Sequence, residues 1–214
     1  MGTPERMRVL LIHGLARSPL SLVGLARDLR RAGHRTELVA YSGALESFPR
    51  IIARVRRRLG LAAQRGDPYA VVGHSLGGLI VRAALDSWPA DRPLPRLIVM
   101  LGTPDRVPRL ARRFHRWWPY RLVNGECGQL LAEPGFFARL PRPPVPTTVI
   151  AGTKSWPRTL SPFDGAPNDG VVAVDEARPD SEASLIELPA SHTFMMNNRQ
   201  VRATVRELLA RAAA

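Results

Sequence analysis

The sequence of 214 residues has few of the features that mark secreted or membrane proteins. Cys127 is its only cysteine, which excludes an intrachain disulfide and fits a reducing compartment. The longest apolar runs, such as residues 97–101, are far too short to span a bilayer. The apolar run that follows Arg8 ends at His13, too early for the core of a signal peptide, so we expect a soluble, cytoplasmic protein.

Lysine is nearly absent too, because Lys154 is the only one and arginine supplies the rest of the positive charge. The 31 basic residues exceed the 18 acidic ones, which gives a net charge of +13. Such a charge can attract nucleic acid, anionic lipid or acidic substrates. No nucleic-acid-binding motif accompanies it, so we do not expect nucleic acid to be a partner and attribute most of the arginines to solvated helix faces.

Short apolar runs alternate with helical patterns along the chain. Helices are expected over residues 21–33, from Ser47 as a possible cap, directly after Ser75, and over residues 194–212. This alternation predicts an α/β protein, with one mostly parallel sheet and helices on both of its faces. The expected strands are residues 8–12, 36–41, 69–72, 97–101, 147–151 and 184–188.

The chain is organised around Gly-His-Ser-Leu-Gly at residues 73–77. The form Gly-x-Ser-x-Gly is weak alone, but an expected buried strand precedes it and an expected helix follows it. In this context it predicts a nucleophile elbow, with the hydroxyl of Ser75 clear of the sheet and glycines where side chains would collide with the strand and helix. The alternative is a glycine-rich turn that only packs a helix against a sheet.

A serine hydroxyl needs an imidazole to take its proton, and His192 is the histidine in the expected place. Working groups of parallel sheets lie beyond the carboxyl ends of strands, and His192 follows the last expected strand. We interpret His74 as structural, because its side chain should point away from the hydroxyl of Ser75, and His13 as part of a loop. For His192 the alternative is a helix-capping or loop role.

The carboxylate that would orient this imidazole is expected between the last two strands. Asp164 and Asp169 both lie there. Asp169 stands in a tight Asn-Asp-Gly turn before two valines, which would present a carboxylate rigidly, whereas Asp164 fits a simple turn residue. Turn chemistry therefore favours Asp169 and leaves Asp164 open.

Five segments carry a resemblance to a known family: Val-Leu-Leu-Ile-His-Gly-Leu at 9–15, Gly-His-Ser-Leu-Gly-Gly at 73–78, Leu-Gly-Thr-Pro at 101–104, Asn-Asp-Gly-Val-Val at 168–172 and Ser-His-Thr-Phe-Met-Met at 191–196. In this order they resemble the α/β-hydrolase superfamily, in its small lipase and esterase branch. The acid turn resembles that of triacylglycerol lipases and GPI-inositol-deacylase-like proteins, which also favours Asp169. The family's usual antiparallel front strands are missing, so we expect a minimal core of about six strands.

The resemblance implies a serine hydrolase that cleaves carboxylic esters, small or lipid, through an acyl-enzyme on Ser75. His192 would act as the base and Asp169 would orient it. The backbone N–H groups of Leu15 and Leu76 would bind the oxyanion.

Other activities remain compatible with the same residues. An acyltransferase or a thioesterase would use the same three side chains, and a catalytically silent, hydrolase-like binding protein is the non-enzymatic alternative. No metal or cofactor is expected, because Cys127 stands alone and the histidines lack the spacing of metal ligands.

Residues 103–146 are the least regular part of the chain, which we expect to be a single domain over 1–214 with this segment inserted as a cap or lid. Such an insertion commonly covers the active site in this fold, so Phe114, Trp117 and Trp118 are expected to contact the acyl chain. The cationic run 109–121 could also bind an anionic membrane surface. The alternative is a packing element whose aromatic side chains fill the core.

Overall fold

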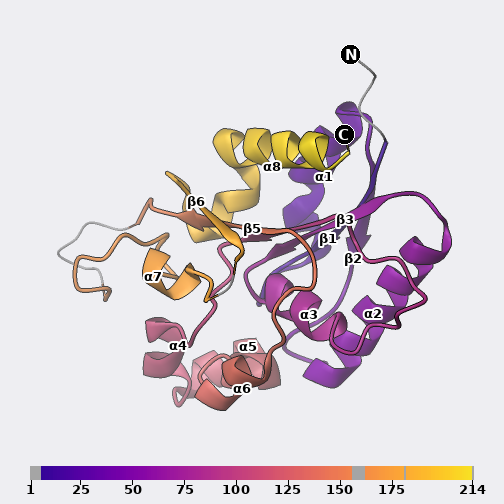
Figure 1. Cartoon of the computed structure of the whole chain (residues 1–214). Coiled ribbons are helices and arrows are strands. Elements are labelled where there is room, and N and C mark those ends of the chain that lie inside the picture. Colours follow the sequence, from indigo (N-terminus) through magenta and orange to yellow (C-terminus); the bar gives the residue numbers. More distant parts are fainter. Residues whose placement is uncertain (1–5, 156–161, 181, 214) are drawn as a thin grey trace.

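A computed structural model describes residues 6–155, 162–180 and 182–213, and in this part of the chain six strands form one sheet (Figure 1). All neighbouring strands are parallel, in the order β2-β1-β3-β4-β5-β6. The predicted core of about six mostly parallel strands is therefore confirmed. The strands are β1 (Arg8–Ile12), β2 (Arg35–Val39), β3 (Tyr69–His74), β4 (Leu97–Leu101), β5 (Thr147–Gly152) and β6 (Ser184–Leu188).

The central strands are buried on both faces, which explains why their sequences are apolar throughout. Every residue of β3, β4 and β5 is buried, whereas the edge strands β2 and β6 are mostly half-buried. Side chains alternate across a strand, so residues 10 and 12 of β1 belong to one apolar core and residues 9 and 11 to the other. The sheet thus lies between two cores.

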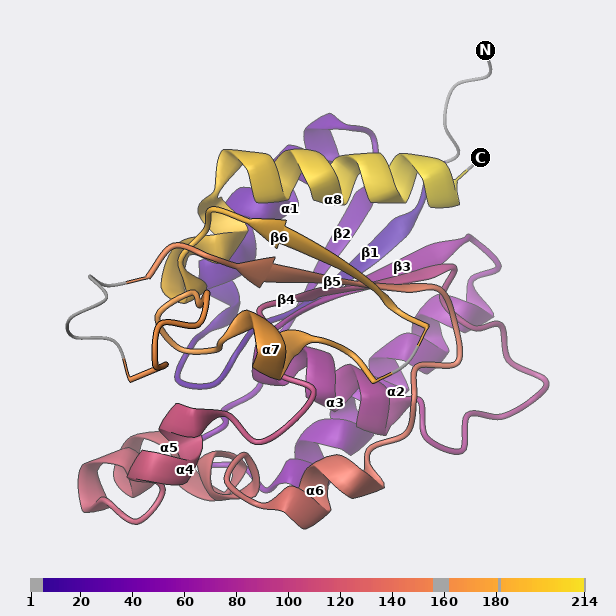
Figure 2. The ribbon, with the colours of Figure 1, turned by 60° about the vertical axis from the view of Figure 1, so that its left-hand side comes forward.

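Helices cover both faces of the sheet, as Figures 1 and 2 show. One face carries α1 (Val23–Arg31) and α8 (Arg199–Ala212), and the other carries α2 (Phe48–Gln64) and α3 (Leu76–Ala84). A short helix, α7 (Val174–Ala177), follows the acid turn and buries its apolar residues in the same core as α2 and α3. Within the described ranges, no helix combines the length and the apolar character that crossing a membrane requires.

The C-terminal helix begins later than the sequence predicts. The helix expected over residues 194–212 is divided into a 3-10 helix, η3 (His192–Asn197), and α8. Asn198 separates the two, because its side chain accepts hydrogen bonds from the amides of Gln200 at 2.9 Å and Val201 at 3.2 Å. The cap therefore defines the start of α8, and His192 lies at the start of η3.

The beginnings of α1 and α2 also differ in detail from the prediction. A 3-10 helix, η1 (Pro19–Leu22), precedes α1. Ser47 is the N-cap residue of α2, as expected, but its side chain makes no capping hydrogen bond. Pro49 occupies the first turn of α2, where its missing N–H leaves no hydrogen bond unmade.

Residues 103–146, called the cap below, contain α4 (Arg109–Phe114), α5 (Trp118–Leu130) and α6 (Pro134–Arg139). These helices form a layer beyond α3, on the side of the sheet away from α8 (Figure 2). The ring of Phe136 packs edge-on against Phe48 of α2, with 5.1 Å between ring centroids. Part of the cap is therefore a packing element.

Candidate active site

Ser75 lies at the sharp turn between β3 and α3. Its backbone has φ 52° and ψ −121°, a strained conformation for a residue with a side chain. The amide of Ser75 donates to the carbonyl oxygen of Leu101 at 2.8 Å. The carbonyl oxygen of Ser75 accepts from the amide of Gly78 at 3.0 Å and from the hydroxyl of Thr103 at 2.9 Å. These three bonds hold the strained turn and fix Ser75 at the carboxyl end of β3.

The glycines of this turn are required by close backbone approaches. A Cβ atom at Gly73 would lie 2.6 Å from the amide nitrogen of Gly78, and one at Gly77 would lie 2.4 Å from the carbonyl oxygen of Ile12. Both obstacles are backbone atoms, so no side-chain movement would relieve the contact. The prediction that side chains at these positions would collide with neighbouring elements is confirmed.

His192 and Asp169 meet beyond the carboxyl ends of β5 and β6. The Nδ1 atom of His192 lies 2.7 Å from Oδ2 of Asp169. Both side chains are buried, with 9% and 1% of their surface exposed. Gly102 makes room for the pair, since a Cβ atom there would lie 3.0 Å from Nδ1 of His192. The contact occupies Nδ1 and leaves Nε2 as the free nitrogen of the ring.

The carboxylate of Asp169 is fixed by its own turn. Its Oδ1 atom accepts hydrogen bonds from the amides of Val171 at 3.0 Å and Val172 at 2.7 Å. Such charge-assisted bonds stabilise an ionised carboxylate in a buried place. Asp164 is exposed in a separate turn with φ 50°. The structure thus brings Asp169, and not Asp164, to the imidazole of His192.

His74 supports the segment that carries His192. Its Nε2 donates to the carbonyl oxygen of His192 at 3.0 Å, and the two rings are 4.9 Å apart. Burial lowers the pKa of His74 well below its ordinary value, so the ring is neutral. A neutral ring with its proton on Nε2 leaves Nδ1 without a proton, and this buried atom has no partner among the described residues. His74 therefore acts on His192 as a structural neighbour.

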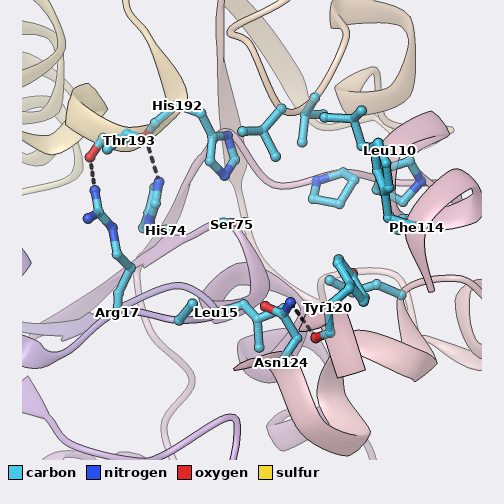
Figure 3. A pocket seen from close by; sticks show the side chains of 17 residues that line it. Leu15, Arg17, His74, Ser75, Leu110, Phe114, Tyr120, Asn124, His192 and Thr193 are labelled. Atoms are coloured by element: carbon cyan, nitrogen blue, oxygen red, sulfur yellow. Dashed lines mark hydrogen bonds between the residues drawn. The ribbon is translucent and has the colours of Figure 1, made fainter. Parts of the chain in front are cut away.

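A cavity of about 400 Å³ opens in front of Ser75 (Figure 3). Ser75, His74 and His192 line one part of it, and Phe114 of the cap lines another. Trp117 and Trp118 do not line the cavity and are 59% and 71% exposed, so the structure does not bring these two expected acyl-chain contacts to the space in front of Ser75. The apolar lining residues are Leu15, Ala16, Pro104, Pro108, Leu110, Ala111, Phe114, Leu131, Val171 and Val172.

Comparison with known proteins identifies the fold. No family model and no curated protein sequence matches this chain. The mature lipase BlEst2 of Bacillus licheniformis is similar in structure, with a TM-score of 0.78 and 18% identity over 96% of this chain and 93% of that one. The chain has the α/β-hydrolase fold.

Two further similar structures are those of a thioesterase and a phospholipase. The thioesterase RedJ from the prodiginine pathway of Streptomyces coelicolor has a TM-score of 0.61 and 17% identity, covering 97% of this chain and 91% of that one. Phospholipase PlaB of Legionella pneumophila has a TM-score of 0.68 and 15% identity, covering 97% of this chain and 63% of that one. At such low identity the likeness concerns the α/β-hydrolase fold alone.

Leu15 and Leu76 are the residues whose backbone amides the sequence resemblance implies for an oxyanion hole. Leu15 follows β1 and lines the cavity, and Leu76 is the first residue of α3. Neither N–H has a hydrogen-bond acceptor among the described residues. The start of a helix also carries the positive end of the helix dipole. Within the described ranges, neither amide is thus occupied by an acceptor of the fold.

Sequence reasoning missed Arg17, which lines the cavity, and Tyr41, which contacts the loop after β1. Tyr41 stacks on His13 with 4.1 Å between ring centroids, and its hydroxyl donates to the carbonyl oxygen of His13 at 2.6 Å. Arg17 lines the cavity and its Nη2 donates to the carbonyl oxygen of Thr193. The place of Arg17, two residues after Leu15, was a signal that could have found it. Tyr41 follows a different strand, and no local pattern links it to His13.

The described residues contain no group of three or more His, Cys, Asp or Glu side chains arranged to hold a metal ion. Cys127 is buried, and burial raises the pKa of its thiol to about 11. A thiol that stays protonated is a poor nucleophile and a poor metal ligand. Cys127 is therefore not a candidate nucleophile.

Proposed function

We propose that this chain is a serine hydrolase of carboxylic esters, in which Ser75 is the nucleophile, His192 the general base and Asp169 the carboxylate that orients the base. The observation that carries the proposal is the 2.7 Å contact between Asp169 and His192 beside a strained, cavity-lining Ser75. A carboxylate on Nδ1 keeps the proton there, so that Nε2 is free to accept one from a serine. The amides of Leu15 and Leu76 form the proposed oxyanion hole.

The first half-reaction forms an acyl-enzyme. The oxygen of Ser75 attacks the ester carbonyl carbon while Nε2 of His192 takes the hydroxyl proton, and the carbonyl π electrons move onto the oxygen. The amides of Leu15 and Leu76 bind this oxyanion, at about 3 kcal/mol for each donor. When the carbonyl re-forms, the ester C–O bond breaks and the alcohol leaves with the proton from His192.

The second half-reaction releases the acid. Water loses a proton to His192 and attacks the acyl carbon. Collapse of the second tetrahedral intermediate breaks the bond to the oxygen of Ser75, which recovers its proton from His192. In an acyltransferase or a thioesterase the same residues act, and the acyl acceptor or the leaving group differs. Analysis of the products distinguishes these alternatives from ester hydrolysis.

The proposal requires that Ser75 and His192 approach each other when an ester binds. Among the described residues the hydroxyl of Ser75 has no hydrogen-bond partner. Catalytic hydrogen bonds are often long in free enzymes and shorten in the complex with substrate. His192 is held by Asp169 and by His74, so the approach falls mainly to the side chain of Ser75 and the substrate.

An apolar acyl group is the substrate part that the cavity fits best. Its cap wall is apolar, with Leu110 and Phe114 facing the space beside Ser75 (Figure 3). Burial of methylene groups against such a wall is favourable, at about 0.8 kcal/mol each when complete. The lipase, phospholipase and thioesterase among the similar structures support a small ester or a lipid as substrate.

The outer surface of the cap is proposed to contact anionic membranes. Four apolar side chains are exposed there beside four exposed arginines, and this set is called the cap patch. Apolar side chains enter the interface of a bilayer while arginines bind acidic head groups. The cap patch consists of Trp117, Trp118, Leu122, Val123, Arg112, Arg113, Arg116 and Arg121.

A fluorophosphonate probe tests the proposed nucleophile. The wild type should form one covalent adduct, and peptide mapping should place it on Ser75. Ser87 provides a matched control, because it has the same φ of 52° but is exposed and does not line the cavity. Ser75→Ala should abolish labelling and hydrolysis of p-nitrophenyl butyrate, and Ser87→Ala should keep both. An adduct elsewhere, or no adduct on the folded wild type, would disprove the assignment.

A further inference from the structure

The cavity in front of Ser75 has one permanently charged side chain among the described residues that line it, Arg17. Arg17 belongs to the loop after β1, two residues beyond Leu15. Its Nη2 donates to the carbonyl oxygen of Thr193, the residue after His192. The guanidinium therefore connects the loop of the proposed oxyanion hole with the loop of the proposed base (Figure 3).

Most of the hydrogen-bonding capacity of this guanidinium is unused. A guanidinium has five N–H donors, and within the described ranges Nε and Nη1 of Arg17 have no acceptor and no carboxylate pairs with it. Arg82 shows the opposite case: its Nε, Nη1 and Nη2 bind the oxygens of Pro141, Asp105 and Leu140. All three nitrogens of Arg82 thus donate to groups of the fold, whereas two nitrogens of Arg17 have no acceptor among the described residues.

Ser75 stands between this charge and the apolar wall of the cavity. In Figure 3, Arg17 and Thr193 lie on one side of Ser75, and Leu110 and Phe114 lie on the other. A substrate with its ester carbonyl at Ser75 and its acyl chain on the apolar wall would direct its alcohol part toward Arg17. The charge of Arg17 also adds to the effect of burial in lowering the pKa of His74, so its field reaches the residue next to Ser75.

We propose that Arg17 forms a subsite for an anionic oxyacid group on the alcohol part of the ester, a phosphate or a sulfonate. A guanidinium binds two oxygens of such a group through parallel hydrogen bonds, which makes it selective for oxyanions over neutral groups. This inference rests on the proposed function, because it uses the ester position that Ser75 defines. It names a substrate class, an amphipathic ester with an apolar acyl chain and an anionic head.

A pair of soluble esters tests the subsite. The anionic ester is 4-butanoyloxybenzenesulfonate and its neutral counterpart is 4-butanoyloxybenzenesulfonamide. The readout is the ratio of their kcat/KM values, in which effects common to both esters cancel. We expect Arg17→Gln to lower this ratio at least about tenfold, which corresponds to about 1.4 kcal/mol. Arg17→Lys should lower it less, because the charge remains and the paired donors are lost.

Arg27→Gln is the matched control for the loss of one positive charge, since Arg27 is exposed on α1. It should leave the ratio unchanged. Raising the salt concentration from about 20 mM to about 500 mM should lower the wild-type ratio, as screening requires. An equal loss on both esters with Arg17→Gln would mean that Arg17 only holds the loops together, and would overturn the proposal.

Lipid substrates identify the source of the anion. Short-chain phosphatidylglycerol and the matching diacylglycerol, both kept monomeric, are compared in release of fatty acid. If Arg17→Gln also lowers this second ratio, the subsite takes a lipid phosphate; if only the first ratio falls, it takes a small anionic alcohol.

The kinetic results that would disprove the subsite differ from those that would disprove the proposed function. Absence of Ser75-dependent hydrolysis of the neutral ester would disprove the proposed function. Ser75-dependent hydrolysis of both esters, with a ratio that Arg17→Gln does not change, would disprove the subsite alone.

Discussion

Asp169 holds His192 at two points, through its side chain and through its backbone. Oδ2 of Asp169 lies 2.7 Å from Nδ1 of His192, and the amide of His192 donates to the carbonyl oxygen of Asp169 at 2.9 Å. The ring and the main chain of His192 are therefore positioned by the same residue. Since Oδ1 of Asp169 is itself held by two amides, neither end of the contact can rotate without loss of hydrogen bonds.

Replacement of Asp169 by asparagine should leave the fold intact and remove most of the activity. The amides of Val171 and Val172 require an oxygen at the Oδ1 position, so the NH₂ group of the new side chain would face Nδ1 of His192. A donor at that place favours the tautomer whose proton is on Nε2, which cannot accept the proton of Ser75. The wrong tautomer costs about 10⁴ in kcat in the serine-protease template. We expect a similar loss in kcat on p-nitrophenyl butyrate.

Asp164→Asn is the matched control, because it makes the same chemical change in an exposed turn. Its kcat should stay within about tenfold of wild type, or about 1.4 kcal/mol of barrier. If Asp164→Asn lost the larger part of the activity in a well-folded protein, the role of the acid would pass to Asp164.

Alanine substitutions at Gly77, in the elbow, and at Gly60, in α2, should change the free energy of unfolding in opposite directions. Gly77→Ala would place a Cβ atom 2.4 Å from the carbonyl oxygen of Ile12, and should lower the free energy of unfolding by at least about 1–3 kcal/mol. Gly60 lies in α2, where a Cβ would meet only the end of the Arg92 side chain at 3.1 Å. Gly60→Ala should raise it by up to about 1 kcal/mol. Urea denaturation measures both, and equal effects would contradict the steric account.

The order of the elements could be predicted from the sequence because the central strands are continuous apolar runs. The edge strand β2 was placed only approximately, since its residues are half-buried and polar enough to blur the ends. The start of α8 was missed because the side chain of Asn198 caps it, a local hydrogen bond that a stripe of apolar residues does not reveal.

Those site residues could be predicted that follow a strand in the sequence. Ser75 follows a central strand and His192 follows the last one, so the topology brings their loops to one end of the sheet. The sequence did not reveal that Phe114 lines the cavity whereas Trp117 does not, because this depends on α4 ending at Phe114, with Trp117 exposed beyond it. The contacts within the fold do not indicate in which cellular compartment the protein is found, so the cytoplasmic location stays a prediction.

The stability of the protein should fall as the pH drops below 6.5. Burial lowers the pKa values of His74, His13 and His34 from their ordinary value of 6.5 in the folded state. Below that value the unfolded chain binds protons that the folded chain does not, so acid favours unfolding, by up to about 1.4 kcal/mol per pH unit for each group. His74→Gln should make the free energy of unfolding less steep between pH 6.5 and 5. An unchanged slope would contradict a neutral, buried His74.

Phe114, rather than the tryptophans, should determine the preference for long acyl chains. It lines the cavity beside Ser75, and each buried methylene contributes about 0.8 kcal/mol. Phe114→Ala should therefore flatten the increase of log(kcat/KM) from acetate to octanoate esters, measured below their critical micelle concentrations. Trp117→Ala should leave that increase unchanged, because Trp117 does not line the cavity. A flatter increase with Trp117→Ala alone would mean that the cap rearranges around the substrate.

The cap patch predicts binding to anionic vesicles. The wild type should sediment with vesicles of phosphatidylglycerol and phosphatidylcholine at about 20 mM salt and be released at about 500 mM, because exposed charges are screened. Vesicles of phosphatidylcholine alone should bind it weakly. Trp117→Ala with Trp118→Ala should weaken binding at about 20 mM salt although all the arginines remain, since insertion of apolar side chains contributes to binding independently of charge.

Substitution of two pairs of arginines distinguishes binding through the cap patch from attraction by the net charge of the whole protein. Arg112→Gln with Arg113→Gln changes the cap patch, whereas Arg30→Gln with Arg31→Gln removes the same charge from the exposed end of α1, on the opposite face of the sheet. Each arginine near an anionic surface contributes about 1 kcal/mol, so the first pair should weaken binding about 30-fold. At about 0.1 M salt the second pair should weaken it only slightly, because α1 would lie farther from the membrane than the Debye length of about 10 Å. Equal losses from the two pairs would show that the net charge of +13, and not the cap, attracts the membrane.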